Sequence, residues 1–408
     1  MKPMPALLFA PALFLAPAVV SQDAYLAEAL QANPEVVAAY ETYMATSTKG
    51  RQVRALEEPV LSYSEFLTSV QTRTGPQERT FAISQAFPWP GLLRLREDLA
   101  DAKARIAYGN YEVKRRMVIE KVGLAAIEYG YLREAVTQAD ESLRLLRQIK
   151  PVIDEKVRAG GGLAPSLRLD VEVAVAEQEV RSLREQRPGL DAQLKILLGR
   201  DPGGEALPWP DLPSAIPVLM PIDHIKAQVR AHHPRLRMAE AEIEGARRME
   251  SLTEKNNRPA FTLGANAIDI GNDGETASSL MVGVKLPLRS GKYKAEREEA
   301  AAMTRAAGAT FEAVEQSLIA DAVRLSAMQE EAMSRLRNYD DHLIPTARQA
   351  LELTKEDFRT DKSDLTDLIE AERVLLDLRL MRARSLADAH KAAWQIRALT
   401  EPTATSSK

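Results

Sequence analysis

The 408-residue chain contains no cysteine, which excludes disulfide bonds, thiolate metal sites and a lipid anchor on an amino-terminal cysteine. Of its five histidines only His232 and His233 are adjacent, and neighbours on a helix point about 100° apart, unsuited to one metal ion. The net charge of −4 is small, so nucleic acid is not expected as a partner. Phosphate-binding loops and nucleophile elbows are also missing. We therefore expect no enzyme activity, no cofactor and no metal site.

Long apolar runs are scarce as well. The first twenty residues combine Lys2, an apolar run over Ala6–Ala16 and a small-residue site at Ala16-Pro-Ala18, which is typical of a secretory signal peptide. Four prolines in this segment argue against a buried helix. No later stretch of roughly 18 apolar residues follows, so the mature chain is expected to be soluble or to span a membrane as a β-barrel.

What the chain does contain is long helical patterning. Aromatic residues make up only 5%, and alanine, leucine, glutamate and arginine dominate, as in long helices. A helix is predicted over Gln22–Glu57, interrupted at Asn33-Pro34, and a second over Leu92–Arg158. At about 1.5 Å per residue the second would be on the order of 100 Å long, too long for a globular core. Gly160-Gly-Gly162 then reverses the chain into a helix over Pro165–Leu198.

The same order of segments returns after about 200 residues, and such a repeat is a strong signal of architecture. His233-Pro234 corresponds to Asn33-Pro34, and a polar reversal at Phe358–Leu365 corresponds to the glycine reversal. The second half is predicted to contain helices over Ile222–Asn256, Lys292–Phe358 and Leu365–Leu399. The division expected is a signal peptide at 1–20, a first repeat at 21–200, an equatorial linker at 201–221, a second repeat at 222–400 and a disordered tail at 401–408.

Each repeat also contains short segments with strand-like alternation. Thr80–Phe87 alternates well, as do Phe261–Ala267 and Leu280–Leu286, whereas Leu61–Val70 alternates poorly and would not be assigned alone. Four strands cannot close a barrel, and strands of about 9–11 residues are long enough to cross a bilayer. Since only a closed barrel satisfies every backbone group in lipid, we expect copies of the chain to pool their strands. The residues expected to face lipid are Phe81, Ile83, Phe261, Leu263, Leu280, Val282 and Val284.

This layout resembles the TolC family of outer-membrane efflux ducts over essentially the whole mature chain. The resemblance rests on the repeat and on motif-like residues in order: Asn33-Pro34, Phe87-Pro-Trp-Pro-Gly91, Gly162-Leu163, His233-Pro234, Leu286-Pro287 with Gly291, and Asp364-Leu365. The Phe-Pro-x-Pro-Gly form looks most like the branch that exports heavy metals and other cations.

The resemblance implies a mainly α fold with a small β part. Tandem helical hairpins would form an α-barrel, and four strands per chain would join a twelve-stranded β-barrel in a homotrimer. The chain would be a passive duct in the bacterial outer membrane, in contact with its lipid and reaching into the periplasm. A periplasmic adaptor (membrane fusion) protein and an inner-membrane pump of the RND type would be its partners. The alternatives are a non-transporting periplasmic coiled-coil scaffold and the outer-membrane duct of a type I protein secretion system.

The resemblance also implies site residues at the two reversals. Asp367 and Glu370 match acidic positions that line the pore constriction, and their i, i+3 spacing places them on one helix face. The first repeat has Ser166 and Leu169 there, so an acidic ring would come from the second repeat only. Adaptor docking would use an exposed small and apolar patch at the tips. The tip residues are Gly161, Gly162, Leu163, Ser363, Asp364 and Leu365.

Overall fold

The computed structural model describes residues 22–160, 162–271, 275–360 and 362–401. The expected signal peptide, Gly161 and nearly all of the expected tail therefore lie outside the described residues. The chain divides into two compact units. The tip unit contains the residues up to Pro34 together with Met117–Ile222 and Ala322–Leu399, and the sheet unit contains Glu35–Arg116, Asp223–Asp321 and the residues from Thr400. Each unit thus combines segments of both sequence repeats.

The long first-repeat helix begins and ends where the sequence predicts it, whereas its two shorter neighbours are broken. The region predicted as one helix with an interruption at Asn33 has a second break at Thr48, and the helix predicted over Pro165–Leu198 breaks at Gln186, two residues before Pro188. The helices are α1 (Gln22–Ala32), α2 (Pro34–Ser47), α3 (Lys49–Arg54), α4 (Leu92–Arg158), α5 (Ala164–Glu185) and α6 (Arg187–Leu197).

The second repeat follows the same order with one addition. The helix predicted over Lys292–Phe358 is interrupted by a π-helical turn, η1 (Tyr339–Leu343), immediately before Pro345. A proline removes one backbone N–H, and a π turn is a common way to accommodate the resulting break. The helices are α7 (Ile222–His232), α8 (Pro234–Asn256), α9 (Ser290–Asn338), α10 (Ile344–Arg359) and α11 (Leu365–Thr400).

The helices break at Asn33-Pro34 and at His233-Pro234. At each break a buried side chain forms a hydrogen bond with a backbone group. Asn33 donates from Nδ2 to the carbonyl of Leu197 at 2.9 Å. His233 caps α8 by accepting a hydrogen bond from the backbone N–H of Arg235 at 3.2 Å. Burial, with the charges of Arg116 and Arg235, lowers the pKa of His233 to about 3. The imidazole is therefore neutral at physiological pH, as its role as a hydrogen-bond acceptor requires.

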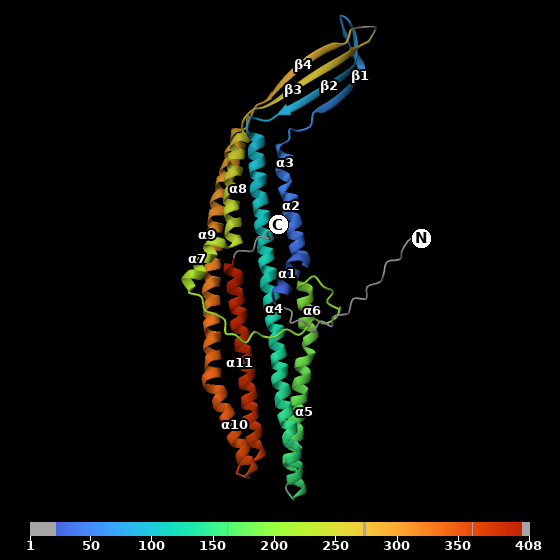
Figure 1. Cartoon of the computed structure of the whole chain (residues 1–408). Helices are drawn as coiled ribbons and strands as arrows, with labels where there is room; N and C mark the ends of the chain where they lie inside the picture. The colour runs from blue at the N-terminus through green and yellow to red at the C-terminus, as the bar shows by residue number, and fades with distance from the viewer. Residues whose placement is uncertain (1–21, 161, 272–274, 361, 402–408) are drawn as a thin grey trace, which may run out of the picture. The chain divides into compact units, whose positions relative to one another are not determined.

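A four-stranded antiparallel sheet lies in the sheet unit, in the order β1-β2-β3-β4 (Figure 1). Its strands are β1 (Val60–Thr72), β2 (Gly75–Phe87), β3 (Ala260–Ile270) and β4 (Ala277–Lys285). β1 covers the segment that alternates poorly, and the pairing with β2 shifts register between Glu65 and Val70. That irregularity explains why the period-two pattern is weak there.

The helices of the tip unit pack as two hairpins around a shared core. Figure 1 shows α5 beside the lower part of α4, and α11 beside α10. Arg147 of α4 contacts Glu177 of α5 at 2.7 Å, and Arg382 of α11 contacts Asp340 of η1 at 2.5 Å. The core residues come from all four helices: Leu146, Ile153, Leu169, Ile344, Ala347, Leu351, Phe358, Leu365, Leu368, Ile369 and Leu375.

Candidate functional site: the helical tips and the apolar sheet face

The first tip is a glycine-dependent turn between α4 and α5. Gly160 adopts φ +101°, a left-handed conformation that favours glycine, and its N–H donates to the carbonyl of Val157 at 3.1 Å. Leu163 follows at the N-cap of α5 and is 60% exposed. An exposed apolar side chain beside a glycine turn is consistent with the docking role expected of Leu163, which stays a prediction.

The second tip is held by polar side chains in place of glycine. Lys362 donates from its N–H to the carbonyl of Asp357 at 2.8 Å, and the Ser363 hydroxyl donates to the carbonyl of Thr354 at 3.3 Å. Asp364 and Asp367 form a reciprocal capping arrangement at the start of α11: Asp367 N–H donates to Asp364 Oδ1 at 3.0 Å, and Asp364 N–H donates to Asp367 Oδ2 at 3.2 Å. The bond from Asp367 N–H holds the pKa of Asp364 below its usual range.

The exposed position expected for Leu365 is wrong. Its side chain is only 5% exposed and belongs to the tip-unit core with Phe358 and Leu368. Leu365 is the first residue of α11, and its i, i+3, i+4 relation to Leu368 and Ile369 places it on the buried face of that helix. The apolar part of the exposed tip surface is therefore contributed by Leu163 of the first tip.

The two tips contact each other within the tip unit. Lys156, near the end of α4, donates to the carbonyl of Phe358 at 3.4 Å, and its ammonium lies 4.4 Å from the centre of the Phe358 ring. Arg168 of α5 donates to the Thr366 hydroxyl of α11 at 2.9 Å. These bonds join the reversal of one repeat to that of the other, so the tips form one structural element.

Asp367 and Glu370 are both exposed on α11, whereas their first-repeat counterparts, Ser166 and Leu169, are buried. Ser166 donates to Asp154 of α4 at 3.0 Å, and Leu169 enters the core. At these corresponding positions the exposed acidic residues belong to the second repeat, and their pore role stays a prediction. Asp367 also has the structural role of a helix cap, which the spacing argument alone did not reveal.

All seven residues predicted to face lipid project from one face of the sheet. Directly paired residues in an antiparallel sheet point to the same side. Ile83 pairs with Ala265, which pairs with Leu280, and Phe261 pairs with Val284. The same pairing adds Leu61 and Tyr63 of β1, which sequence reasoning missed. The opposite face carries small and polar side chains, among them Ser84, Thr262, Gly264, Asn266 and Ser279.

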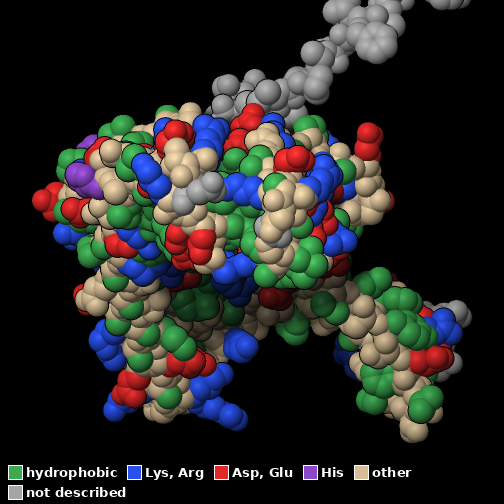
Figure 2. Space-filling view, turned by 90° about the horizontal axis from the view of Figure 1, so that it is seen from below, with side chains coloured by type: hydrophobic (Ala, Val, Ile, Leu, Met, Phe, Trp, Pro, Cys, Tyr) green, Lys and Arg blue, Asp and Glu red, His purple; other side chains and the backbone are tan. Residues whose placement is uncertain are grey.

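A second apolar surface runs along α5 and was not predicted. Leu163, Leu167, Val171 and Val175 recur every four residues and are each more than half exposed. Their spacing was the signal available in the sequence, since residues four apart lie on one helix face. Figure 2 shows hydrophobic side chains reaching the surface of the chain between acidic and basic ones. Such a row of exposed valines and leucines is typical of a surface that binds another protein.

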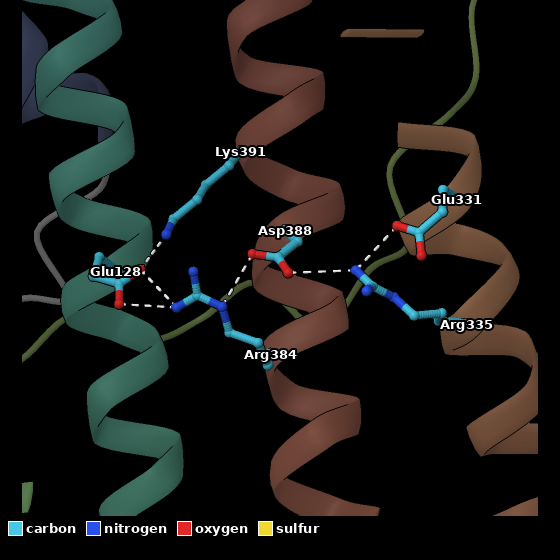
Figure 3. Close-up of polar contacts among 6 residues, drawn as sticks. All are labelled: Glu128, Glu331, Arg335, Arg384, Asp388 and Lys391. Atoms are coloured by element: carbon cyan, nitrogen blue, oxygen red, sulfur yellow. Dashed lines mark hydrogen bonds and ion pairs between the residues drawn. The ribbon is translucent and has the colours of Figure 1, made fainter. Parts of the chain in front are cut away.

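An extended ion-pair network joins three helices of the tip unit (Figure 3). Arg384 of α11 contacts both carboxylate oxygens of Glu128 of α4, at 2.9 and 3.1 Å, and Lys391 pairs with the same carboxylate. Asp388 then bridges Arg384, at 3.1 Å, and Arg335 of α9, at 3.5 Å. Partial burial acts to raise the pKa of Glu128, but Lys391 and Arg384 outweigh it and hold that pKa below its ordinary value.

The described residues contain no cluster of three or more His, Asp or Glu side chains that could hold a metal ion. None of the helices in the described part of the chain is both long and apolar enough to cross a membrane. The surfaces described above are therefore built from helix ends, exposed apolar rows and charge networks.

Comparison with known proteins gives a family match and a shared fold. Residues 226–400 match the family model described as outer membrane efflux protein. No curated protein sequence shows significant similarity to the chain.

Solved outer-membrane channels have the same fold over nearly the whole chain. The outer membrane protein VceC from Vibrio cholerae has a TM-score of 0.76 at 17% identity, covering 93% of this chain and 96% of its own. The CmeC outer membrane channel of Campylobacter jejuni has a TM-score of 0.77 at 12% identity, covering 98% and 93%. CusC, described as forming a transmembrane channel, has a TM-score of 0.79 at 12% identity, covering 96% of each chain.

Proposed function

Because this chain matches the outer membrane efflux protein family over residues 226–400 and has the fold of TolC-type channels, we propose that it is the outer-membrane duct of a tripartite efflux system. A family of channels is not a class of enzymes. In this proposal the chain is a passive conduit, and an inner-membrane pump of the RND type together with a periplasmic adaptor supplies the substrate. The observation that carries the proposal is the one-sided apolar face of the four-stranded sheet.

That face is suited to lipid and the other to water. Seven apolar side chains, together with Leu61 and Tyr63, project from one side, whereas the other side is mostly small and polar, with Ile268 and Met281 as larger apolar residues. A barrel wall with an aqueous lumen needs this alternation. β1 and β4 are the outer strands of the sheet, so each has an edge on which a strand from a second copy could pair. Three copies would contribute twelve strands, an even number in the range of outer-membrane barrels.

The exposed row on α5 supports the same assembly. Exposed apolar side chains are costly to leave in water, and a neighbouring helical hairpin of another copy would cover Leu167, Val171 and Val175 while leaving Leu163 at the tip. The tips would then be arranged around a common axis, and Asp367 and Glu370 would form acidic rings near the periplasmic entrance. Gly162, Leu163, Ser363 and Asp364 would be available to an adaptor, with Gly161 proposed there on sequence alone.

Membrane fractionation tests the proposal against a periplasmic coiled-coil scaffold. We expect the chain in the outer-membrane fraction, as a trimer whose migration on gels changes on heating. The matched variant replaces Leu280 and Val282 of β4 with serine, which removes apolar area from the proposed lipid face without touching the helices. That variant should lose trimer and membrane recovery. Recovery of the unaltered chain in the soluble periplasm, without a trimer, would exclude the duct.

Conductance in planar bilayers tests the proposed constriction. We expect Asp367→Asn combined with Glu370→Gln to raise single-channel conductance and to weaken block by Mg²⁺. A tenfold higher blocking concentration corresponds to about 1.4 kcal/mol of lost binding, a reasonable scale for removing two rings of charge. Asparagine retains much of the capping ability of aspartate.

Asp364→Asn is the control, because it alters the same helix cap without removing either proposed ring residue. Unchanged conductance and block in the double variant would remove Asp367 and Glu370 from the constriction. An equal change in the Asp364→Asn control would assign the effect to the cap. The alternative for a functional duct is a type I secretion system, in which the cargo is a secreted polypeptide. The identity of the pump distinguishes that system from a tripartite efflux system.

A further inference from the structure

One carboxylate of α11 occupies a position that helix geometry assigns to the core. The buried face of this helix carries Leu365, Leu368, Ile369 and Leu375. Glu372 lies on the same face, four residues after Leu368 and three before Leu375, and is 6% exposed. A glutamate in the middle of an apolar stripe is rare unless it is paired.

Glu372 is only partly satisfied there. Interaction with the Ser142 hydroxyl of α4 acts to lower the pKa of Glu372, against the effect of burial. The Oε2 atom is buried and has no hydrogen-bond partner among the described residues. A buried carboxylate oxygen without a donor strongly disfavours the ionised form, whereas a protonated carboxyl needs fewer donors.

The cations nearest to Glu372 are each paired with another carboxylate. Glu372 lines a cavity of about 340 Å³ between α4, α10 and α11. Lys355 of α10 contacts Glu352 at 2.9 Å, and Arg379 of α11 contacts Glu141 of α4 at 3.5 Å. The other charged residues lining this cavity are Arg144 of α4 and Arg348 of α10.

The balance of these effects favours the neutral acid. Burial raises the pKa of Glu372, and the charge of Glu352 adds to that effect, while Lys355, Arg379 and the Ser142 hydroxyl oppose it. The pKa of Glu352 is lowered by its bond from Lys355, so that pair remains ionised when Glu372 becomes protonated. The pKa of Glu372 is raised and that of Glu352 is lowered, so Glu372 takes up a proton before Glu352 as the pH falls.

We propose that Glu372 is a proton-sensitive contact that sets how tightly α11 packs against α4 and α10 above the second tip. In the protonated form the apolar face of α11 is continuous and the three helices close on one another. Ionisation places negative charge on a carboxylate whose Oε2 atom has no donor among the described residues, and the cavity then opens to admit water or a cation. The closed form is favoured below the raised pKa and is lost as pH rises through it.

The contact is a property of the helices and does not depend on conduction. It would nevertheless influence a duct, because Asp367 and Glu370 lie on α11 within two turns of Glu372. Only this consequence for conductance rests on the proposed function. A measurement of helix separation therefore tests the contact by itself.

The absence of cysteine makes site-specific spin labelling of the full chain straightforward. Leu353→Cys on α10 and Asp377→Cys on α11 place labels at two exposed positions. Labelled protein is diluted with unlabelled protein, so that one pair is measured per assembly, and the distance distribution is recorded from about pH 4 to about pH 8, which spans glutamate's ordinary value and a raised one. We expect a longer-distance population to grow at least threefold with rising pH, with a midpoint above glutamate's ordinary value of about 4.3.

Two variants decide the assignment. Glu372→Gln and Glu372→Leu should both keep the short distance at every pH, with leucine also completing the apolar face. Glu352→Gln, in the same cavity, is the control: it should retain the pH response with a lower midpoint, because it removes a charge that helps to raise the pKa of Glu372 and releases Lys355. A wild-type distribution independent of pH, or a response that survives in both Glu372 variants, would overturn the proposal. Conductance on the same samples is a separate readout: a pH-dependent distance with constant conductance supports the contact and counts against its coupling to a duct.

Discussion

Replacing Gly123 with alanine is expected to destabilise the tip unit strongly, although it adds only one methyl group. Gly123 lies in α4, and an added Cβ would approach Cε2 and Nε1 of Trp394 to 2.0 Å. The indole cannot move freely, because Trp394 is 9% exposed and its N–H donates to the carbonyl of Ile119 at 3.1 Å. Overpacking of this kind costs about 1–3 kcal/mol, and such a short approach favours the upper end.

The effect can be separated from helix propensity, which on its own favours alanine. At Gly308, in α9, an added Cβ would have no neighbour within 4 Å. Gly308→Ala should therefore stabilise the chain by about 0.5–1 kcal/mol, the opposite sign from Gly123→Ala. Combining Gly123→Ala with Trp394→Leu should recover part of the loss, because the smaller side chain removes the clash.

Thermal unfolding of the purified chain, followed by circular dichroism, measures these differences. Gly123→Ala should lower the unfolding midpoint and Gly308→Ala should raise it. Equal midpoints for wild type and Gly123→Ala would mean that α4 and α11 do not approach as closely as the structure indicates.

The second large effect is expected at a buried ion pair. Lys195 and Asp191, one turn apart on α6, approach to 2.6 Å with side chains that are only 3% and 7% exposed. Lys195 also donates to the carbonyl of Gly204 at 2.8 Å, and Asp191 accepts from the N–H of Leu207 at 2.7 Å. The pair therefore fixes the start of the linker that follows α6. Lys195→Met leaves a buried, uncompensated carboxylate, which costs about 3–5 kcal/mol.

A double variant separates the cost of losing the ion pair from the cost of leaving the Asp191 carboxylate buried without a partner. Asp191→Asn keeps an acceptor for Leu207, so Asp191→Asn with Lys195→Met should be more stable than Lys195→Met alone. Glu155→Gln is the control, because Glu155 and Arg158 pair at 3.1 Å with side chains that are 74% and 76% exposed. Its effect on the free energy of unfolding should be about 0–0.5 kcal/mol. If Lys195→Met lost as little free energy of unfolding as Glu155→Gln, the buried pair would contribute little to stability.

The sequence predicts the repeat, the long helices and three of the four strands, because these depend on local periodicity. The extent of α4 follows from an apolar pattern that continues from Leu92 to Arg158, and the helix runs through its one internal proline, Pro151. β1 could not be assigned because its register shift disturbs the alternation, and its pairing with β2 is a non-local property.

Near the second tip, the helical periodicity of the sequence already indicates which residues lie on the buried face. The sequence places Leu365 at the start of a helix and predicts that it is exposed at the tip, although its spacing to Leu368 and Ile369 puts it on the buried face. Glu372 lies on that stripe too, and a glutamate there would ordinarily be read as a solvated residue. Its burial depends on how α10 and α4 pack against α11, which no local pattern encodes.

The π turn Tyr339–Leu343 changes the spacing of the buried residues along α9 and α10. Ala322, Gln329 and Leu336 are buried at intervals of seven, and Ile344, Leu351 and Phe358 are buried at intervals of seven, but the step from Leu336 to Ile344 is eight. A continuous α-helix would turn the lower set by about 100° away from the core for that one extra residue. The π turn accommodates this extra residue. The buried residues before and after the turn therefore lie on the same side of the helix despite a single-residue insertion.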